Sequence, residues 1–332
     1  MDDDALVELG RALREADYHF VTPTPETHRR VNARAGNEEA RDLRGVFGWS
    51  RPFREGLLPR ELQDLLARAG ALATVGGGAE SRAPESGGAE SRAPDSGEGG
   101  RARAGGGPLL RSRVRFSTLA GELFVHSAYP TVAADSVFFG PDTYRFAALL
   151  LGAVQRAGTV VDVGCGSGAG GILLARRAGH VVLSDVNPLA LRYARVNARL
   201  SGAGDRVEVV ESDVLRSVRG DFDLVVSNPP YLADEGARVY RDGGGPRGID
   251  LSVRIAREAL ERLPRGGRLL LYSASPVEDG RNPLHEALLP LLRGTRSTFT
   301  ELDPDVFGEE LERPAYAQAD RIAVVALDAV LL

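Results

Sequence analysis

From residue 140 onward, short apolar runs alternate with longer segments in which apolar residues recur at helical spacing. Each run is short and almost uniformly aliphatic, which predicts strands at 158–164, 180–185, 206–213, 222–228 and 267–273. The segments between them, such as 250–263, predict amphipathic helices. This alternation is typical of a doubly wound, mostly parallel α/β sheet with helices on both faces. The last two expected strands, 295–302 and 321–327, have no helix between them and could pair antiparallel at one edge.

The first 75 residues follow a helical pattern instead. Apolar residues at helical spacing predict helices in the segments 3–16, 24–35 and 59–70. The second of these opens with Thr24 and Pro25, a pair typical of a helix N-terminus. We therefore expect a small helical N-terminal domain over residues 1–75.

A compositionally distinct stretch, 76–107, separates this region from the rest. It carries no large apolar side chain and contains a ten-residue unit, GAESRAP[E/D]SG, twice in tandem. Such a segment cannot offset the entropy of ordering itself, so we interpret it as a disordered linker. The connection 108–139 follows, in which the alternating pattern of 111–127 predicts a β-hairpin. The remainder, 140–332, forms the larger domain.

Composition narrows the possible functions. The 332-residue chain has a net charge of −5, which argues against a protein that coats long nucleic acid. Every basic side chain apart from histidine is arginine, which excludes lysine Schiff-base chemistry and a Walker-type lysine. One cysteine, Cys165, and five scattered histidines provide neither a disulfide framework nor metal-ligand spacing. The acidic N-terminus and the lack of a long apolar stretch predict a soluble, cytoplasmic protein without membrane or metal partners.

A glycine-rich turn follows the first strand of the alternating region. Within the sequence DVGCGSGAGG, Asp162 precedes Gly164, Gly166 and Gly168, and Gly171 completes a G-x-G-x-x-G spacing. Glycines allow a sharp turn and a close approach of a ligand to the backbone. Dinucleotides and S-adenosylmethionine both use such a loop, and a purely structural turn is the alternative.

Carboxylates follow the successive strands at the edge where ligands bind in open α/β sheets. Asp185 is placed to accept both hydroxyls of a ribose, and Asn187 is assigned to the same cofactor site. Asp213 could accept from an adenine amino group, and Asp162 could attract the ammonium of a methionyl tail. A dinucleotide would explain the glycines and Asp185 but would leave Asp162 without a role.

The fourth strand ends in the sequence Ser-Asn-Pro-Pro-Tyr, residues 227–231. Together with VVDVGCGSG, LSDVNPLAL and VVESDVL, this order resembles the class I S-adenosylmethionine-dependent methyltransferases that carry an NPPY signature. The resemblance covers roughly 140–330 and implies a seven-stranded Rossmann-like sheet with S-adenosylmethionine as cofactor. In that family the signature belongs to enzymes that methylate planar nitrogens, namely exocyclic amines of adenine or guanine and the amide of glutamine.

The chemistry of the signature agrees with this resemblance. A planar NH2 group is a poor nucleophile because its lone pair is delocalised. The side-chain oxygen of Asn228 and the carbonyl of Pro229 can each accept one N–H, which frees the lone pair to face the methyl donor. Pro229 and Pro230 fix the backbone, and Tyr231 offers a flat face for stacking. We therefore predict Asn228, Pro229, Pro230 and Tyr231 as catalytic residues, with Asn228 also touching the cofactor.

Two features favour a protein glutamine as the acceptor. The loop 239–251 resembles the corresponding stretch of the release-factor glutamine methyltransferases, which also have a helical N-terminal domain that binds the protein substrate. The segment 137–149 occupies the place of a family segment packed over the cofactor, while 303–316 is an extension that departs from the family. The alternatives are an amino group of RNA or DNA, a small-molecule or peptide amine, and a binding module that has lost turnover.

Overall fold

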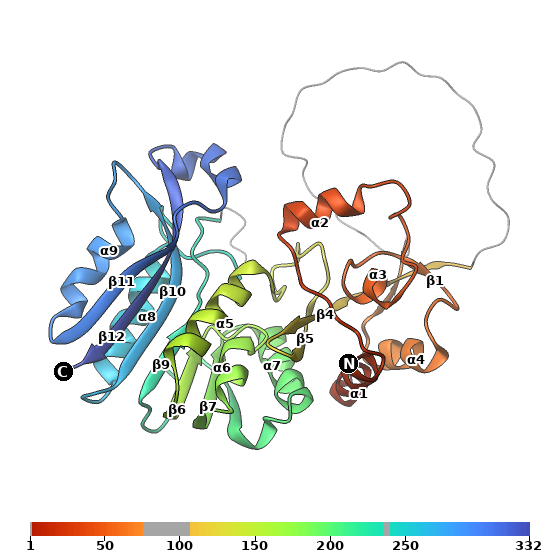
Figure 1. Ribbon diagram of the computed structural model, residues 1–332, viewed down its shortest axis with the longest axis horizontal. Coiled ribbons are helices and arrows are strands. Elements are labelled where there is room, and N and C mark those ends of the chain that lie inside the picture. The colour runs from red at the N-terminus through yellow and green to blue at the C-terminus, as the bar shows by residue number, and fades with distance from the viewer. Residues whose placement is uncertain (1, 76–106, 235–239) are drawn as a thin grey trace, which may run out of the picture.

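The structure is a computed structural model and describes residues 2–75, 107–234 and 240–332. One sheet is built from β6 (Ala157–Val163), β7 (Ala178–Asp185), β8 (Val207–Glu211), β9 (Leu224–Ser227), β10 (Arg268–Val277), β11 (Thr295–Asp303) and β12 (Arg321–Leu331). Its strand order is β11-β12-β10-β9-β6-β7-β8 (Figure 1). The strands β8, β7, β6, β9 and β10 run parallel, and β12 is antiparallel to both β10 and β11. The doubly wound sheet and its antiparallel edge are therefore confirmed.

The first strand of this sheet in the sequence is β6. The next two, β7 and β8, are added on one side of β6, and the chain then crosses to place β9 on its other side. The order of the strands reverses between β6 and β9, and open α/β sheets bind ligands outside the carboxyl ends of the strands at such a point. The glycine-rich turn follows β6 and the NPPY signature follows β9. The topology therefore brings the two motifs to the same edge of the sheet.

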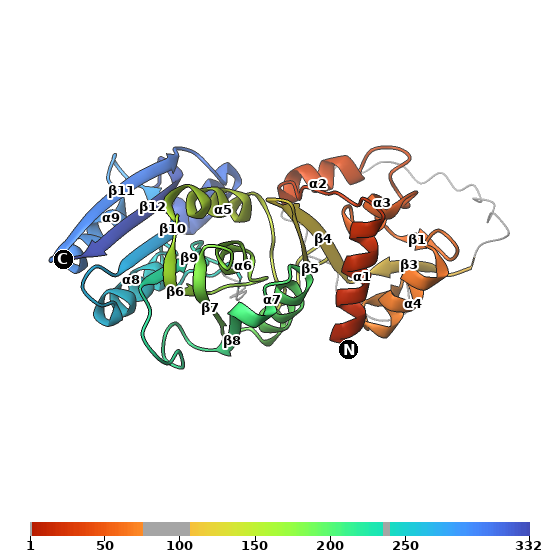
Figure 2. The ribbon, with the colours of Figure 1, turned by 60° about the horizontal axis from the view of Figure 1, so that its bottom comes forward.

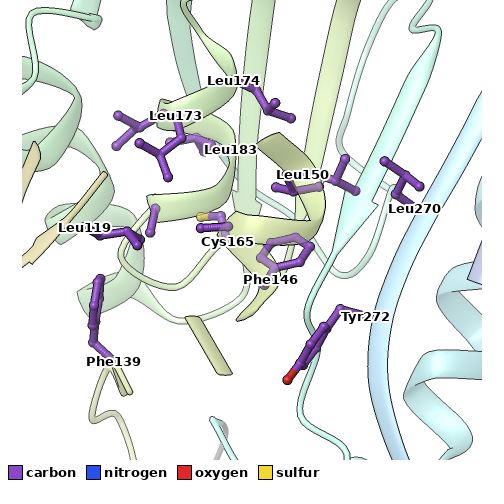
Figure 3. Packing of buried hydrophobic residues seen from close by; sticks show 14 of the residues in the cluster. Leu119, Phe139, Phe146, Leu150, Cys165, Leu173, Leu174, Leu183, Leu270 and Tyr272 are labelled. Atoms are coloured by element: carbon purple, nitrogen blue, oxygen red, sulfur yellow. The ribbon is translucent and has the colours of Figure 1, made fainter. Parts of the chain in front are cut away.

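Helices cover both faces of the sheet: α5 (Pro141–Ala153), α6 (Ala169–Leu174) and α7 (Pro188–Leu200) on one, α8 (Asp250–Arg262) and α9 (Pro283–Leu288) on the other. Because neighbouring strand residues point to opposite faces, Val160 packs with α5 and α6, whereas Val161 packs with α8. Figure 3 shows the first of these clusters, in which Phe146 and Leu150 of α5 approach Leu270 and Tyr272 of β10. Short 3-10 turns add η1 (Gly204–Arg206), η2 (Leu289–Leu292), η3 (Gly308–Glu312) and η4 (Pro314–Tyr316).

The N-terminal region contains the expected helices α1 (Asp3–Glu15), α2 (Pro25–Asn32) and α4 (Arg60–Arg68), together with a short α3 (Leu43–Phe47). As predicted, Thr24 caps α2 by accepting the N–H of Thr27. The sequence did not reveal a small sheet, in which β3 (Leu109–Ser112) lies between β1 (Phe53–Arg54) and β2 (Leu72–Thr74). These strands are two to four residues long, too short to show an alternating pattern.

The hairpin expected at 111–127 is present as β4 (Val114–Leu119) and β5 (Glu122–Ser127). The segment interpreted as a linker, 76–107, lies outside the described residues except for Gly107. Figure 2 shows the N-terminal elements gathered at one end of the molecule, beside α7.

One apolar cluster joins the N-terminal elements to α7. It contains Leu6 and Leu13 of α1 as well as Tyr193 and Leu200 of α7. A Cβ atom placed on Gly10 would lie 2.6 Å from Cδ2 of Leu200, so the two helices touch closely at this point. Ion pairs between acidic residues of α1 and arginines of α7 flank the contact, Asp3 with Arg192 and Asp4 with Arg199.

Candidate active site

A cavity of about 580 Å³ opens at the carboxyl ends of β6, β7 and β9. The glycine-rich turn and the NPPY signature both line it. All of the predicted site residues except Asp162 and Gly168 are among its lining residues: Gly164, Gly166, Asp185, Asn187, Asp213, Asn228, Pro229, Pro230 and Tyr231. The structure thus brings together in one cavity residues from four separate strand ends.

The glycine turn adopts backbone conformations that other residues rarely tolerate. Gly164, Gly166 and Gly168 have φ values of +68°, +55° and +79°. A Cβ atom on Gly164 would meet nothing within 4 Å, so the backbone there faces open space in the cavity. A Cβ atom on Gly168 would instead lie 2.9 Å from Cδ1 of Leu183. Gly168 therefore allows α6 to pack tightly on the sheet, while Gly164 lets a ligand approach the main chain.

Asp185 connects the turn to the next strand end. Its carboxylate accepts the N–H of Gly166 at 2.9 Å and the N–H of Asn187 at 2.9 Å. Burial raises the pKa of Asp185, while these backbone hydrogen bonds oppose the shift. Asn187 caps α7 by accepting the N–H of Leu189, and its amide donates to the carbonyl of Asp135. These contacts fix the rim of the cavity.

Asp162 lies beneath the glycine turn rather than on the cavity wall. Its side chain is buried, and Oδ2 accepts the N–H of Gly171 at 2.7 Å. Oδ1 is buried without a hydrogen-bond partner among the described residues. Burial raises the pKa of Asp162 to about 7, the hydrogen bond from Gly171 lowers it, and the nearby Asp185 raises it further. Cys165 of the same turn is also buried and lies in the apolar cluster shown in Figure 3.

Asp213 lines the cavity, and its carboxylate is bound by an arginine of α8. Arg254 of α8 donates to both of its carboxylate oxygens, each at 2.8 Å. This hydrogen bonding lowers the pKa of Asp213. The exposed carboxylate therefore stays ionised and oriented, with its remaining lone pairs available to a ligand.

The NPPY signature lines the cavity beside the glycine turn, because β9 is the neighbour of β6 in the sheet. Asn228 is half-buried, and the Tyr231 side chain is mostly buried, with its ring centroid 6.4 Å from Tyr272 and 6.1 Å from Phe307. Burial raises the pKa of Tyr231 well above its usual value, and Asp142 adds to the shift. The hydroxyl of Tyr272 donates to Oδ1 of Asp142 at 2.7 Å. Tyr231 is thus held by aromatic packing, and it borders the cavity together with Phe307.

Several lining residues come from segments that the sequence could not connect with the site. The aromatic residues of 137–149, the segment that the resemblance places over the cofactor, divide into two groups: Phe138 lines the cavity and stacks on Tyr240, whereas Phe139 and Tyr144 contact each other and are not lining residues. The other lining residues include Pro25, Tyr129, Asp142, Arg241, Phe307 and Glu309. The resemblances at 137–149 and 239–251 gave a sequence signal for Asp142 and Arg241, and no such signal marked the rest.

Comparison with known proteins supports the class indicated by this geometry. The family model for the Methyltransferase small domain matches residues 132–286. Release factor glutamine methyltransferase of Deinococcus radiodurans is 35% identical over 213 residues, which cover 60% of this chain and 73% of the relative. The enzyme of the same name from Cereibacter sphaeroides is 39% identical over 166 residues, which cover 40% of this chain and 60% of the relative. The chain therefore spans less than two thirds of the second relative's length.

Among solved structures, a tRNA m1G37 methyltransferase of M. jannaschii aligns with a TM-score of 0.46 at 16% identity, over 66% of this chain and 57% of that one. The strand order, the glycine turn and the family match define a class I S-adenosylmethionine-dependent methyltransferase, and the chain belongs to this family. Within the class it is related to the release factor glutamine methyltransferases, at 30 to 39% identity.

The cavity fits S-adenosylmethionine on structural grounds. The donor carries a sulfonium and an ammonium charge, which suit a cavity bordered by the carboxylates of Asp185 and Asp213. The open space over Gly164 lets a ligand lie against the backbone. The region of the chain that the structure describes contains no cluster of three metal-ligating side chains and no helix long and apolar enough to cross a bilayer.

Proposed function

We propose that this enzyme methylates a planar nitrogen, with the side-chain amide of a glutamine in a protein as the acceptor. One observation carries the proposal: Asn228 and Pro229 border the same cavity as Gly164 and Asp185. An acceptor held by the signature therefore lies within the space that holds the donor. Asp185 is assigned to the ribose hydroxyls and Asp213 to the adenine.

S-adenosylmethionine supplies an electrophilic methyl group on a positively charged sulfur. The side-chain oxygen of Asn228 and the carbonyl of Pro229 each accept one N–H of the acceptor, so its lone pair is directed at the methyl carbon. The N–C bond forms as the C–S bond breaks, and the methylated nitrogen then releases one proton to solvent. Pro230 keeps the backbone rigid, so catalysis consists mainly of positioning.

The charges of the cavity support a protein acceptor over a nucleic acid. The described lining residues include five carboxylates, Asp142, Asp185, Asp213, Asp242 and Glu309, but only one arginine, Arg241. Arg241 is itself paired with Glu310 and Asp234. Phosphate groups bind best where Lys or Arg side chains are available, and such a lining disfavours them. The relatives of this chain among the release factor glutamine methyltransferases support the same choice.

The N-terminal region also contributes to the mouth of the cavity. Pro25 at the start of α2 lines it together with Tyr129 and Pro130, which follow the hairpin. We assign substrate recognition to residues 1–75 on this basis, because these elements are placed to contact whatever surrounds the acceptor side chain.

The variant Asn228→Ala tests the proposal. We expect methyl transfer to fall by about two orders of magnitude or more, because the acceptor nitrogen is no longer oriented. Transfer is measured with tritiated donor in cell lysate separated into protein, RNA and DNA, followed by mass spectrometry for methylglutamine. Asn282→Ala, which removes an amide that caps α9 away from the cavity, is the matched control. Label in RNA or DNA alone, or full activity of Asn228→Ala, would contradict the proposal.

A further inference from the structure

The segment 303–316, interpreted from the sequence as an extension, packs against the signature and the residues that follow it. It connects β11 to β12 and forms the dark blue turns at the upper left of Figure 1. Phe307 and Glu309 of this segment line the cavity, although they lie far from the signature in sequence. The extension is therefore part of the site.

A buried ionic cluster fixes the extension to the residues that follow the signature. Glu310 and Asp234 are both buried. Arg241 pairs with Glu310 and, at 3.2 Å, with Oδ1 of Asp234. Nε of Arg313 lies 2.9 Å from Oε2 of Glu310. Two arginines thus neutralise two buried carboxylates, which holds the segment in one arrangement because breaking such a cluster leaves an uncompensated buried charge.

Hydrogen bonds anchor the extension on both sides of this cluster. The N–H of Ala233, two residues after Tyr231, donates to the hydroxyl of Tyr316 at 2.8 Å. The N–H of Val306 donates to the carbonyl of Ile322 on β12 at 2.9 Å. The segment is therefore attached both to the sheet and to the signature, and its geometry follows theirs.

Phe307 occupies an unusual backbone conformation within this frame. Its φ of +56° lies in the left-handed region, which is uncommon for a bulky residue and carries a cost in free energy. The conformation places its ring 6.1 Å from the ring of Tyr231, with an angle of 49° between their planes. Such strain persists only where the surroundings determine it, and it clusters at functional sites.

We propose that Phe307 is the specificity-determining wall of the acceptor end, where its ring extends the aromatic surface of Tyr231 beside Asn228 and contacts the side chain that carries the planar amide. An aromatic face suits the aliphatic stem of a glutamine side chain, and Arg241 behind it is occupied by carboxylates. The extension thereby selects a neutral polypeptide side chain over a phosphate-bearing acceptor. This inference rests on the proposed function, and it assigns acceptor selection to a segment outside the NPPY signature.

The test compares Phe307→Ala and Phe307→Gly with the wild-type enzyme, using the glutamine-containing protein fraction as acceptor. We expect the acceptor KM to rise about 5- to 30-fold in both variants, because an aromatic contact is lost. The donor Kd, measured by calorimetry, should change less than about twofold. Phe307→Gly removes the ring and also relieves the left-handed strain, so it separates the contact from any loss of folding.

Two further variants complete the design. Phe307→Tyr retains the ring and should restore the KM to within about twofold of wild type. Phe299→Ala removes a half-buried ring of β11 that stacks on His285 outside the cavity, and should leave the acceptor KM unchanged. An unchanged acceptor KM in Phe307→Gly, or an equal rise in donor Kd, would overturn the inference. If the wild-type enzyme labels RNA instead of protein, the proposed function fails. In that case the KM for the RNA is measured in the same Phe307 variants, and an unchanged value would show that Phe307 does not contact the acceptor.

Discussion

Asp162 is a buried carboxyl group beneath the glycine turn, with one oxygen bonded to Gly171 and the other unpartnered among the described residues. Burial raises its pKa from 3.8 to about 7. Between about pH 4 and pH 7 the folded protein therefore holds a proton that the unfolded chain has released. The stabilisation that this proton provides is fully present below about pH 4 and is lost as the pH rises through about 7.

Asp162→Asn should remove this pH dependence. An amide keeps an acceptor for Gly171 and needs no proton, so the variant should gain stability relative to wild type as the pH rises from 4 to 7. The relative gain in unfolding free energy is on the order of 4 kcal/mol at most. Urea unfolding of both proteins at pH 4.5 and about pH 8 measures it. Parallel pH profiles for the two proteins would show that Asp162 does not titrate in this window.

The sequence predicted where the site residues lie but not all of their partners. Asp185 and Asn228 follow strands whose ends must meet at one edge of the sheet, so their approach could be foreseen. That Arg254 would bind Asp213 depends on how α8 packs, which no local pattern reveals. The contact of Phe307 with Tyr231 could not be predicted from the sequence either, because it depends on a buried ionic cluster formed by residues distant in sequence.

At the scale of elements, the glycine turn must leave open space for a ligand at Gly164 and allow close packing of α6 at Gly168. Gly164 and Gly168 share a left-handed backbone, but only Gly168 lies against neighbouring side chains. Strand and helix patterns predicted the turn between β6 and α6, because apolar runs and glycines mark it clearly. The short strands β1 and β2 were missed, because they pair with β3 across a long stretch of sequence.

Alanine variants of the two glycines should therefore differ. Gly168→Ala adds a clash with Leu183 to the backbone strain and should lower the melting temperature more than Gly164→Ala, whose strain alone costs about 1 kcal/mol. Gly164→Ala projects a methyl group into the cavity and should weaken donor binding. Thermal melts and calorimetry on both variants measure the two effects. Equal melting temperatures would mean that α6 shifts to accommodate the added methyl group.

At the scale of the whole molecule, α1 and α7 share one apolar cluster, so unfolding of the N-terminal elements should destabilise the catalytic sheet. Gly10→Leu inserts a side chain where α1 touches Leu200, and we expect a loss of about 1 to 3 kcal/mol. Fluorescence of Trp49, the only tryptophan, reports on the N-terminal region, and far-ultraviolet circular dichroism reports on the whole chain. The two signals should change together.

The control for this experiment is Arg11→Ala, which alters the neighbouring exposed position of the same helix and should leave stability within about 0.5 kcal/mol of wild type. Two separate transitions in Gly10→Leu would show instead that the N-terminal elements unfold independently of the sheet.

The sheet ends in two outer strands, β8 and β11, whose exposed side chains include Glu208, Glu211, Arg296 and Glu301. An outer strand has unpaired backbone groups that could template strand addition by another protein, and charged side chains oppose it because docking would strip their water. The charged residues on the two edge strands therefore oppose the addition of a strand from another chain, which is the first step of edge-to-edge aggregation.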